Sequence, residues 1–193
     1  MTLSVTGTAG KAPRAQGPMW AATGLAWLPL AALVLASDQW AKWQVLSHLT
    51  PYRSLPVLPP VLNFTLLYNT GAAFSLLDTG PGWQRVLFTV VALAVSAWIV
   101  AMLGTLKARG QALLAASGAL ILGGALGNVA DRVRLGHVVD FIDAHWQTYH
   151  FWAFNVADAA ITVGVVIYLA LHLAGRYGRG LVAQGREARE KEA

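Results

Sequence analysis

Four uncharged runs constrain the fold of this chain more than any other feature of its sequence. They cover residues 19–37, 86–106, 111–130 and 159–175, and none contains Asp, Glu, Lys or Arg. Each is close to the roughly twenty residues that a helix needs to cross a bilayer. Charged residues make up 12% of the chain, whereas soluble domains average about 25%. We therefore predict an all-α membrane protein with four transmembrane helices, in a single domain over residues 1–193.

The first uncharged run has a second interpretation, as a cleaved signal peptide, because Val34-Leu35-Ala36 is an acceptable small-residue cleavage site. Its apolar stretch exceeds the roughly 7–15 residues usual in signal peptides, so a retained helix is preferred. Residues 1–17 are small, polar and glycine-containing, and are predicted to be a disordered tail. The polar residues 177–193 are predicted to form a second tail.

The distribution of charge predicts the orientation in the membrane. The net charge is +5, which by itself is compatible with nucleic-acid binding. Most basic residues, however, lie in the two tails and in the short turn at 107–110, whereas all aspartates lie in or beside the segments 38–84 and 132–157. The positive-inside rule then places both termini in the cytoplasm and these two long segments outside. We expect carboxylate chemistry at the outer face of the cytoplasmic membrane, and no nucleic-acid partner.

The two long segments differ in their predicted structure. Residues 38–84 contain four prolines between 51 and 60, followed by a β-rich stretch at 61–69 and a turn at 78–82. This segment is predicted to form a small folded structure on the membrane surface. Residues 132–157 are predicted to be a loop with interfacial aromatic side chains.

A duplicated tetrapeptide carries the candidate chemistry. Asn-Val-Ala-Asp occurs at 128–131, where it closes the third run, and again at 155–158, where it opens the fourth. If the two runs are antiparallel helices, both copies lie at one level, and Asn and Asp share a face in each copy. Ionisable groups at such a place are by default functional. Asp131 and Asp158 are therefore the predicted catalytic pair, with Asn128 and Asn155 beside them.

Two carboxylates in one site cannot both ionise easily, so one keeps a proton while the other acts as a base. Such a pair can activate water against a peptide carbonyl and then protonate the leaving amine. No metal, cofactor or nucleophilic side chain is needed, and the sequence contains no cysteine. Helix dipoles favour negative charge at Asp158 and disfavour it at Asp131. Asp158 is thus the predicted base and Asp131 the predicted acid, although Arg132 would favour the reverse.

Three other functions remain possible from the residues alone. A serine intramembrane protease would use Ser117 with His172. A metal-dependent membrane phosphotransferase would use Asp131, Asp140 and Asp143. A non-enzymatic ion or proton carrier would need aspartates at mid-membrane, whereas these lie at the ends of the uncharged runs.

Several ordered motifs over residues 20–175 resemble those of the lipoprotein signal peptidases, the type II signal peptidases, which are intramembrane aspartic proteases. The matches are Asp38-Gln39-x-x-Lys42, Asn69-x-Gly71-Ala72-Ala73-Phe74, Gly127-Asn128-x-x-Asp131-Arg132, Val139-Asp140-Phe141-Ile142 and Phe154-Asn155-x-Ala157-Asp158. Ala41 departs from the Ser or Thr that many members carry.

The resemblance implies a fold of four transmembrane helices, with a small outer β-sheet and a short lid helix from the first long segment. It implies that Asp131 and Asp158 remove signal peptides from diacylglyceryl-modified prolipoproteins, just before the lipidated cysteine. It also implies inhibition by the cyclic peptide globomycin, and we expect a monomer. The residues matched to substrate binding or support of the site are Asp38, Lys42, Asn69, Gly71, Asn128, Arg132, Asp140 and Asn155.

Overall fold

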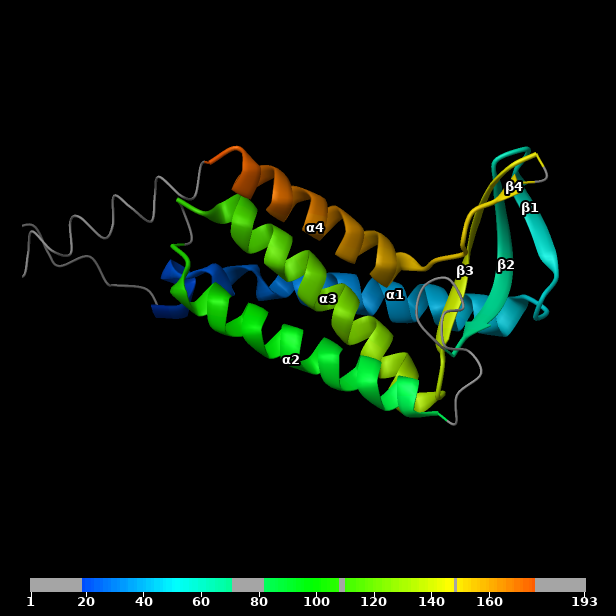
Figure 1. Ribbon diagram of the computed structural model, residues 1–193, viewed down its shortest axis with the longest axis horizontal. Helices are drawn as coiled ribbons and strands as arrows, with labels where there is room; N and C mark the ends of the chain where they lie inside the picture. The colour runs from blue at the N-terminus through cyan, green and yellow to red at the C-terminus, as the bar shows by residue number, and fades with distance from the viewer. Residues whose placement is uncertain (1–18, 71–81, 108–109, 148, 176–193) are drawn as a thin grey trace, which may run out of the picture.

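A computed structural model gives the structure of the protein, and it describes residues 19–70, 82–107, 110–147 and 149–175. Its helices run side by side, and a small sheet lies across one end of them (Figure 1). The elements in chain order are η1 (Met19–Ala22), η2 (Gly24–Trp27), α1 (Leu28–His48), β1 (Ser54–Leu58), β2 (Leu62–Asn69), α2 (Trp83–Thr105), α3 (Ala112–Arg134), β3 (Val138–Trp146), β4 (Tyr149–His150) and α4 (Val156–Leu173).

Three helices, α2, α3 and α4, are long and apolar enough to cross a membrane. Helix α1 packs with them but does not have this composition, because its second half carries charged side chains. This helix also differs from the sequence prediction. Its α-helical part begins at Leu28 and continues to His48, whereas the first run was expected to end at residue 37 and be followed by a loop. As a result, Asp38 and Lys42 project from consecutive turns of one helix.

Helix α3 is the centre of the bundle, since it contacts α1, α2 and α4. Small residues permit this close packing. A Cβ built on Gly123 would lie 2.5 Å from the carbonyl oxygen of Ala31 on α1, and one on Gly124 would collide with that of Ala157 on α4. The outward sides of α2 and α4 expose aliphatic side chains such as Val90 and Val166, as expected of surfaces that face lipid.

Gly127, also on α3, packs directly against a polar side chain of α1. A Cβ at this position would lie 2.7 Å from Oδ2 of Asp38, a fully buried carboxylate. We expect Gly127→Ala to lower the free energy of unfolding by about 1–3 kcal/mol, because added methyl groups strain a well-packed interior. Gly104→Ala is the control, because no neighbouring atom lies within 4 Å of its added Cβ. Thermal melts in detergent measure both; equal melting temperatures would contradict the expected clash.

The sheet is antiparallel and its strands lie in the order β1-β2-β3-β4. Strand β2 confirms the strand predicted at 61–69. The segment 132–157 was expected to be a loop, and this was wrong: β3 and β4 come from it, so the sheet draws strands from both long segments. The pairing of β2 with β3 joins residues about seventy positions apart, including Leu67 with Asp140, and such a contact leaves no local signal in the sequence.

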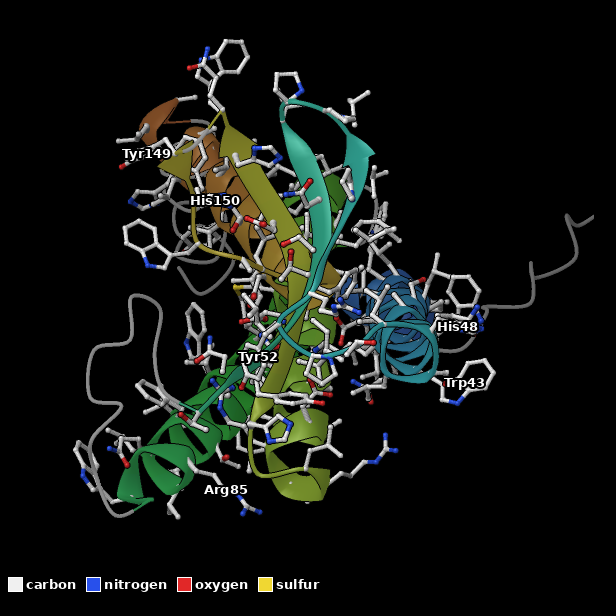
Figure 2. The ribbon with its side chains drawn as sticks, turned by 90° about the vertical axis from the view of Figure 1, so that its right-hand side faces the viewer. Trp43, His48, Tyr52, Arg85, Tyr149 and His150 are labelled. Carbon is white, nitrogen blue, oxygen red and sulfur yellow. The ribbon has the colours of Figure 1, made fainter. Side chains whose placement is uncertain are left out.

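Seen from the sheet end, the strands cross in front of the helices (Figure 2). Tyr149 and His150 of β4 lie on one side of the molecule, and Trp43 and His48 of α1 lie on the other. The described part of the first long segment contains no helix after His48 and before Trp83. The predicted lid helix and Gly71 lie outside the described residues.

Candidate active site

The buried side chain of Lys42 connects α1 with α3, because it pairs with a carboxylate on each helix. The ammonium group of Lys42 lies 2.8 Å from Asp38 Oδ2, 2.8 Å from Asp131 Oδ2 and 3.1 Å from Asn128 Oδ1. Lys42, Asp38 and Asp131 are each at most 2% exposed. A buried ion is tolerated only when its partners satisfy it, and here three oxygen acceptors match the three hydrogens of the ammonium group.

Asp131, one of the predicted catalytic residues, accepts on both carboxylate oxygens from protein donors. Its Oδ2 accepts from Lys42 and from the backbone N–H of Val139 at 3.1 Å, while its Oδ1 accepts from Gln39 Nε2 at 2.9 Å. An ionised carboxylate only accepts hydrogen bonds, so every contact here suits that form. A proton on either oxygen would face a donor. The expected role of Asp131 as the proton-bearing acid therefore does not fit its contacts.

Asp158 lies at the start of α4, and its position follows from the local sequence. Asn155 is the N-cap residue of this helix, and its side chain accepts from the backbone N–H of Asp158 at 2.9 Å. Asn128 Nδ2 donates to Asp158 Oδ1 at 2.7 Å. The carboxyl group therefore sits within the first turn, where the helix dipole favours negative charge. Asp158 is partly exposed, whereas Asp131 is not.

Asp140 comes from strand β3 and is held by two amides. Asn155 Nδ2 donates to its Oδ1 at 2.7 Å, and Asn69 Nδ2 donates to its Oδ2 at 3.0 Å. Burial raises the pKa of Asp140 to about 6; the two amide bonds oppose this shift, and the nearby charge of Asp158 adds to it. Two carboxyl groups that influence each other in this way, one buried and one open, have the arrangement of an acid and a base.

The structure thus brings together most of the predicted site residues, and two asparagine side chains connect them. Asn155 contacts Asp140, Asn128 and the Val139 carbonyl, and Asn128 contacts Asp158. Asp131 is connected to the carboxylate of Asp158 through Lys42 and Asn128. The guanidinium of Arg132 lies 5.6 Å from the centroid of the Phe88 ring. It also interacts electrostatically with the carboxyl groups of Asp158, Asp140 and Asp131.

Neither alternative residue set forms a site. Ser117 is fully buried and donates its hydroxyl to the Leu114 carbonyl at 2.7 Å, while His172 stacks on Tyr168. The three aspartates of the phosphotransferase alternative have separate partners. Asp143 pairs with His150 at 2.9 Å and accepts from Thr65, on the part of the sheet that carries β4.

Gln39 is a site residue that the sequence analysis did not single out, although it lies inside the first matched motif. Its Nε2 contacts carboxylates of both Asp38 and Asp131, and its Oε1 accepts from Arg134 at 3.1 Å. The backbone N–H of Ala157 was also missed; it donates to Asp38 Oδ1 at 2.9 Å. The one indication of this contact in the sequence is that position 157 holds a small residue, alanine, which allows α4 to lie close to α1.

Comparison with known proteins identifies the family of this chain. The family described as signal peptidase (SPase) II matches residues 30–174. A lipoprotein signal peptidase of Pseudomonas putida is 54% identical over 150 residues, which cover 77% of this chain and 86% of the relative. One of Pseudomonas aeruginosa is 49% identical over 162 residues, covering 83% and 95%.

Solved structures agree with the sequence comparison. A bacterial membrane enzyme determined by the in meso method superposes with a TM-score of 0.70 at 30% identity, covering 78% of this chain and 89% of that one. A second has a TM-score of 0.67 at 31% identity, covering 77% and 92%. The match over most of both chains, in sequence and in fold, establishes that this chain belongs to the signal peptidase II family of bacterial membrane proteases.

Proposed function

We propose that this chain is an intramembrane aspartic endopeptidase that removes signal peptides from diacylglyceryl-modified prolipoproteins, just before the lipidated cysteine. Asp140 and Asp158 are its catalytic pair, in place of the pair Asp131 and Asp158 expected from the sequence. The observation that carries this proposal is the contrast between the carboxyl groups. Asp140 accepts from Asn155, Asp158 accepts from Asn128, and the two asparagine side chains are bonded to each other. The carboxylate of Asp131 instead accepts from Lys42, Gln39 and the Val139 N–H.

The chemistry follows from the two environments. Asp158, ionised at the helix start and open to water, takes a proton from a water molecule held between the carboxyl groups. The water oxygen attacks the peptide carbonyl carbon, and Asp140 gives its proton to the carbonyl oxygen. When the resulting tetrahedral diol breaks its C–N bond, the proton on Asp158 goes to the leaving amine, and a diol hydroxyl returns a proton to Asp140. The products are a signal peptide with a new carboxylate and a lipoprotein with a free α-amino group.

The surrounding residues position the pair and the substrate. Asn69 at the end of β2 and Asn155 hold Asp140, and Asn128 holds Asp158. Arg132 lies near all three carboxylates with its guanidinium over Phe88, where it is placed to bind a substrate carbonyl oxygen. The buried ion pairs of Lys42 with Asp38 and Asp131 hold α1 against α3 and thereby support these residues.

We further propose α1 as a fourth membrane span, with both termini in the cytoplasm and the sheet at the outer face of the inner membrane. The five aspartates among the described residues then lie on the outer side, where a lipidated substrate presents its cleavage site. Every residue assigned here comes from one chain, so a monomer suffices. Globomycin-type cyclic peptides are expected to compete with the substrate.

A gel-shift assay on a prolipoprotein tests this function. The purified chain should cleave the diacylglyceryl-modified substrate and should leave the same substrate without its lipid intact, and globomycin should block the cleavage. Full cleavage in EDTA is expected, because the mechanism uses only carboxyl groups and water. Equal cleavage of the lipid-free substrate would contradict the proposed substrate class.

A further inference from the structure

We propose that Gln39 is a positioning residue for cleavage: it orients Asp131, and through the backbone of Val139 it sets where Asp140 stands relative to Asp158. This inference rests on the proposed catalytic pair of Asp140 and Asp158. It concerns a residue that contacts neither of them.

The side-chain amide of Gln39 is held in one orientation at both of its ends. Its Nε2 lies 2.9 Å from Asp131 Oδ1, 3.2 Å from Asp38 Oδ2 and 3.2 Å from the Gly127 carbonyl oxygen, all of which are acceptors. Its Oε1 accepts from the Arg134 guanidinium at 3.1 Å. Exchanging the nitrogen and oxygen would place an acceptor among three acceptors and a donor against a guanidinium. Gln39 can therefore act as a fixed donor to Asp131.

The carboxylate of Asp131, oriented in this way, in turn holds the backbone of strand β3. With Oδ1 held by Gln39, the other carboxylate oxygen points at Lys42 and at the Val139 N–H, 3.1 Å away. The carbonyl of the same residue, Val139, accepts from Asn155 Nδ2 at 3.3 Å. Both peptide groups that flank Val139 are thereby fixed, one by α3 and one by the cap of α4. Asp140 is the next residue, so these two bonds help to set its position, together with the amides of Asn69 and Asn155 that bind its carboxylate.

The arrangement also explains why a glutamine occupies this position among carboxylates. A carboxylate at position 39 would accept from Arg134 equally well but would offer no hydrogen to Asp131, and an apolar side chain would do neither. Since misplacing a catalytic group by about 1 Å costs as much as about 100-fold in rate, loss of the Gln39 donor should appear in kcat. Substrate binding, which involves other residues, should change little.

The test compares Gln39→Met and Gln39→Glu with wild type over a range of pH, using the diacylglyceryl-prolipoprotein assay. For Gln39→Met we expect kcat to fall about 10-fold, KM to change less than about twofold, and the ratio to wild type to be constant with pH. For Gln39→Glu the loss should be larger near pH 8 and should be relieved as the pH falls. Protonation of the introduced carboxyl, which faces Asp38, Lys42, Asp131 and Arg134, restores a donor to Asp131. A purely structural role would give no such recovery.

Gln44→Met is the matched control on the same helix, because the side chain of Gln44 makes no hydrogen bond within the described residues. It should keep the wild-type kcat. Deuterium exchange of the Val139 amide provides a readout independent of activity, and should be faster in Gln39→Met than in Gln44→Met. The role of Gln39 is overturned if kcat of Gln39→Met equals wild type, or if Gln39→Glu shows no acid recovery. Activity that survives in Asp140→Asn would instead overturn the catalytic pair itself.

Discussion

Replacing Asp140 or Asp158 by Asn is expected to lower kcat by about 10³–10⁴-fold, the contribution typical of a positioned acid or base. Asn preserves the shape of each side chain but removes the proton transfer. Asp131→Asn is expected to lower kcat much less, by about 10–100-fold, because Asp131 acts on the reaction only through the position of Asp140. The gel-shift assay under single-turnover conditions measures all three, at concentrations of folded enzyme matched by size-exclusion chromatography.

The stabilities of the same variants should follow the opposite order. In the folded state the pKa of Asp140 is raised to about 6 from the ordinary 3.8. Its contribution to stability is therefore present below about pH 4 and is lost as the pH rises through about 6. Asn does not ionise, so Asp140→Asn does not lose this stability at high pH. Its melting temperature at pH 8 should equal or exceed that of wild type. Asp131→Asn should melt lower, because it weakens the contacts of the buried Lys42. A high melting temperature for Asp131→Asn, together with a complete loss of cleavage, would favour the pair expected from the sequence.

Lys42→Met is expected to cause a large loss of stability. The substitution leaves the carboxylates of Asp38 and Asp131, both at most 2% exposed, without the cation that lies 2.8 Å from each. Breaking a buried ion pair in this way costs about 3–5 kcal/mol. Thermal melts in detergent, or the yield of folded protein at different growth temperatures, measure the effect.

Two controls make this prediction specific. Lys107→Met removes an exposed lysine and should shift the stability by no more than about 0.5 kcal/mol. The triple variant Lys42→Met, Asp38→Asn, Asp131→Asn removes the stranded charges and should recover part of the lost stability. If the triple variant is less stable than Lys42→Met alone, electrostatics are not the cause of the loss.

The helices could be predicted from the sequence because they depend on local composition. The uncharged runs predicted α2, α3 and α4, and the β-rich stretch at 61–69 predicted β2. The error at α1 has a clear cause. A run defined by the absence of charge ends at Asp38, yet the helix continues to His48 because Lys42 pairs with Asp38 one turn later and both are buried against α3.

The sequence predicted which residues gather at the candidate site, whereas the catalytic pair that we propose differs from the pair it suggested. The duplicated Asn-Val-Ala-Asp suggested two equivalent copies, but Asn155 is an N-cap while Asn128 lies within α3. Asp140 was assigned to a loop, because the strand that carries it is defined by pairing with β2 across about seventy residues. Once β3 forms, Asp140 accepts a hydrogen bond from Asn155, and on this contact rests our proposal that Asp140 rather than Asp131 is the partner of Asp158.

The most direct test of the account is an infrared titration of the protonated carboxyl C=O stretch in wild type and in the Asp→Asn variants. We predict a band that titrates near pH 6, from the raised pKa of Asp140. It should persist in Asp131→Asn, be absent in Asp140→Asn, and move to lower pH in Asp158→Asn as the neighbouring charge is lost. A band that disappears in Asp131→Asn and persists in Asp140→Asn would contradict the assignment of Asp140 to the catalytic pair.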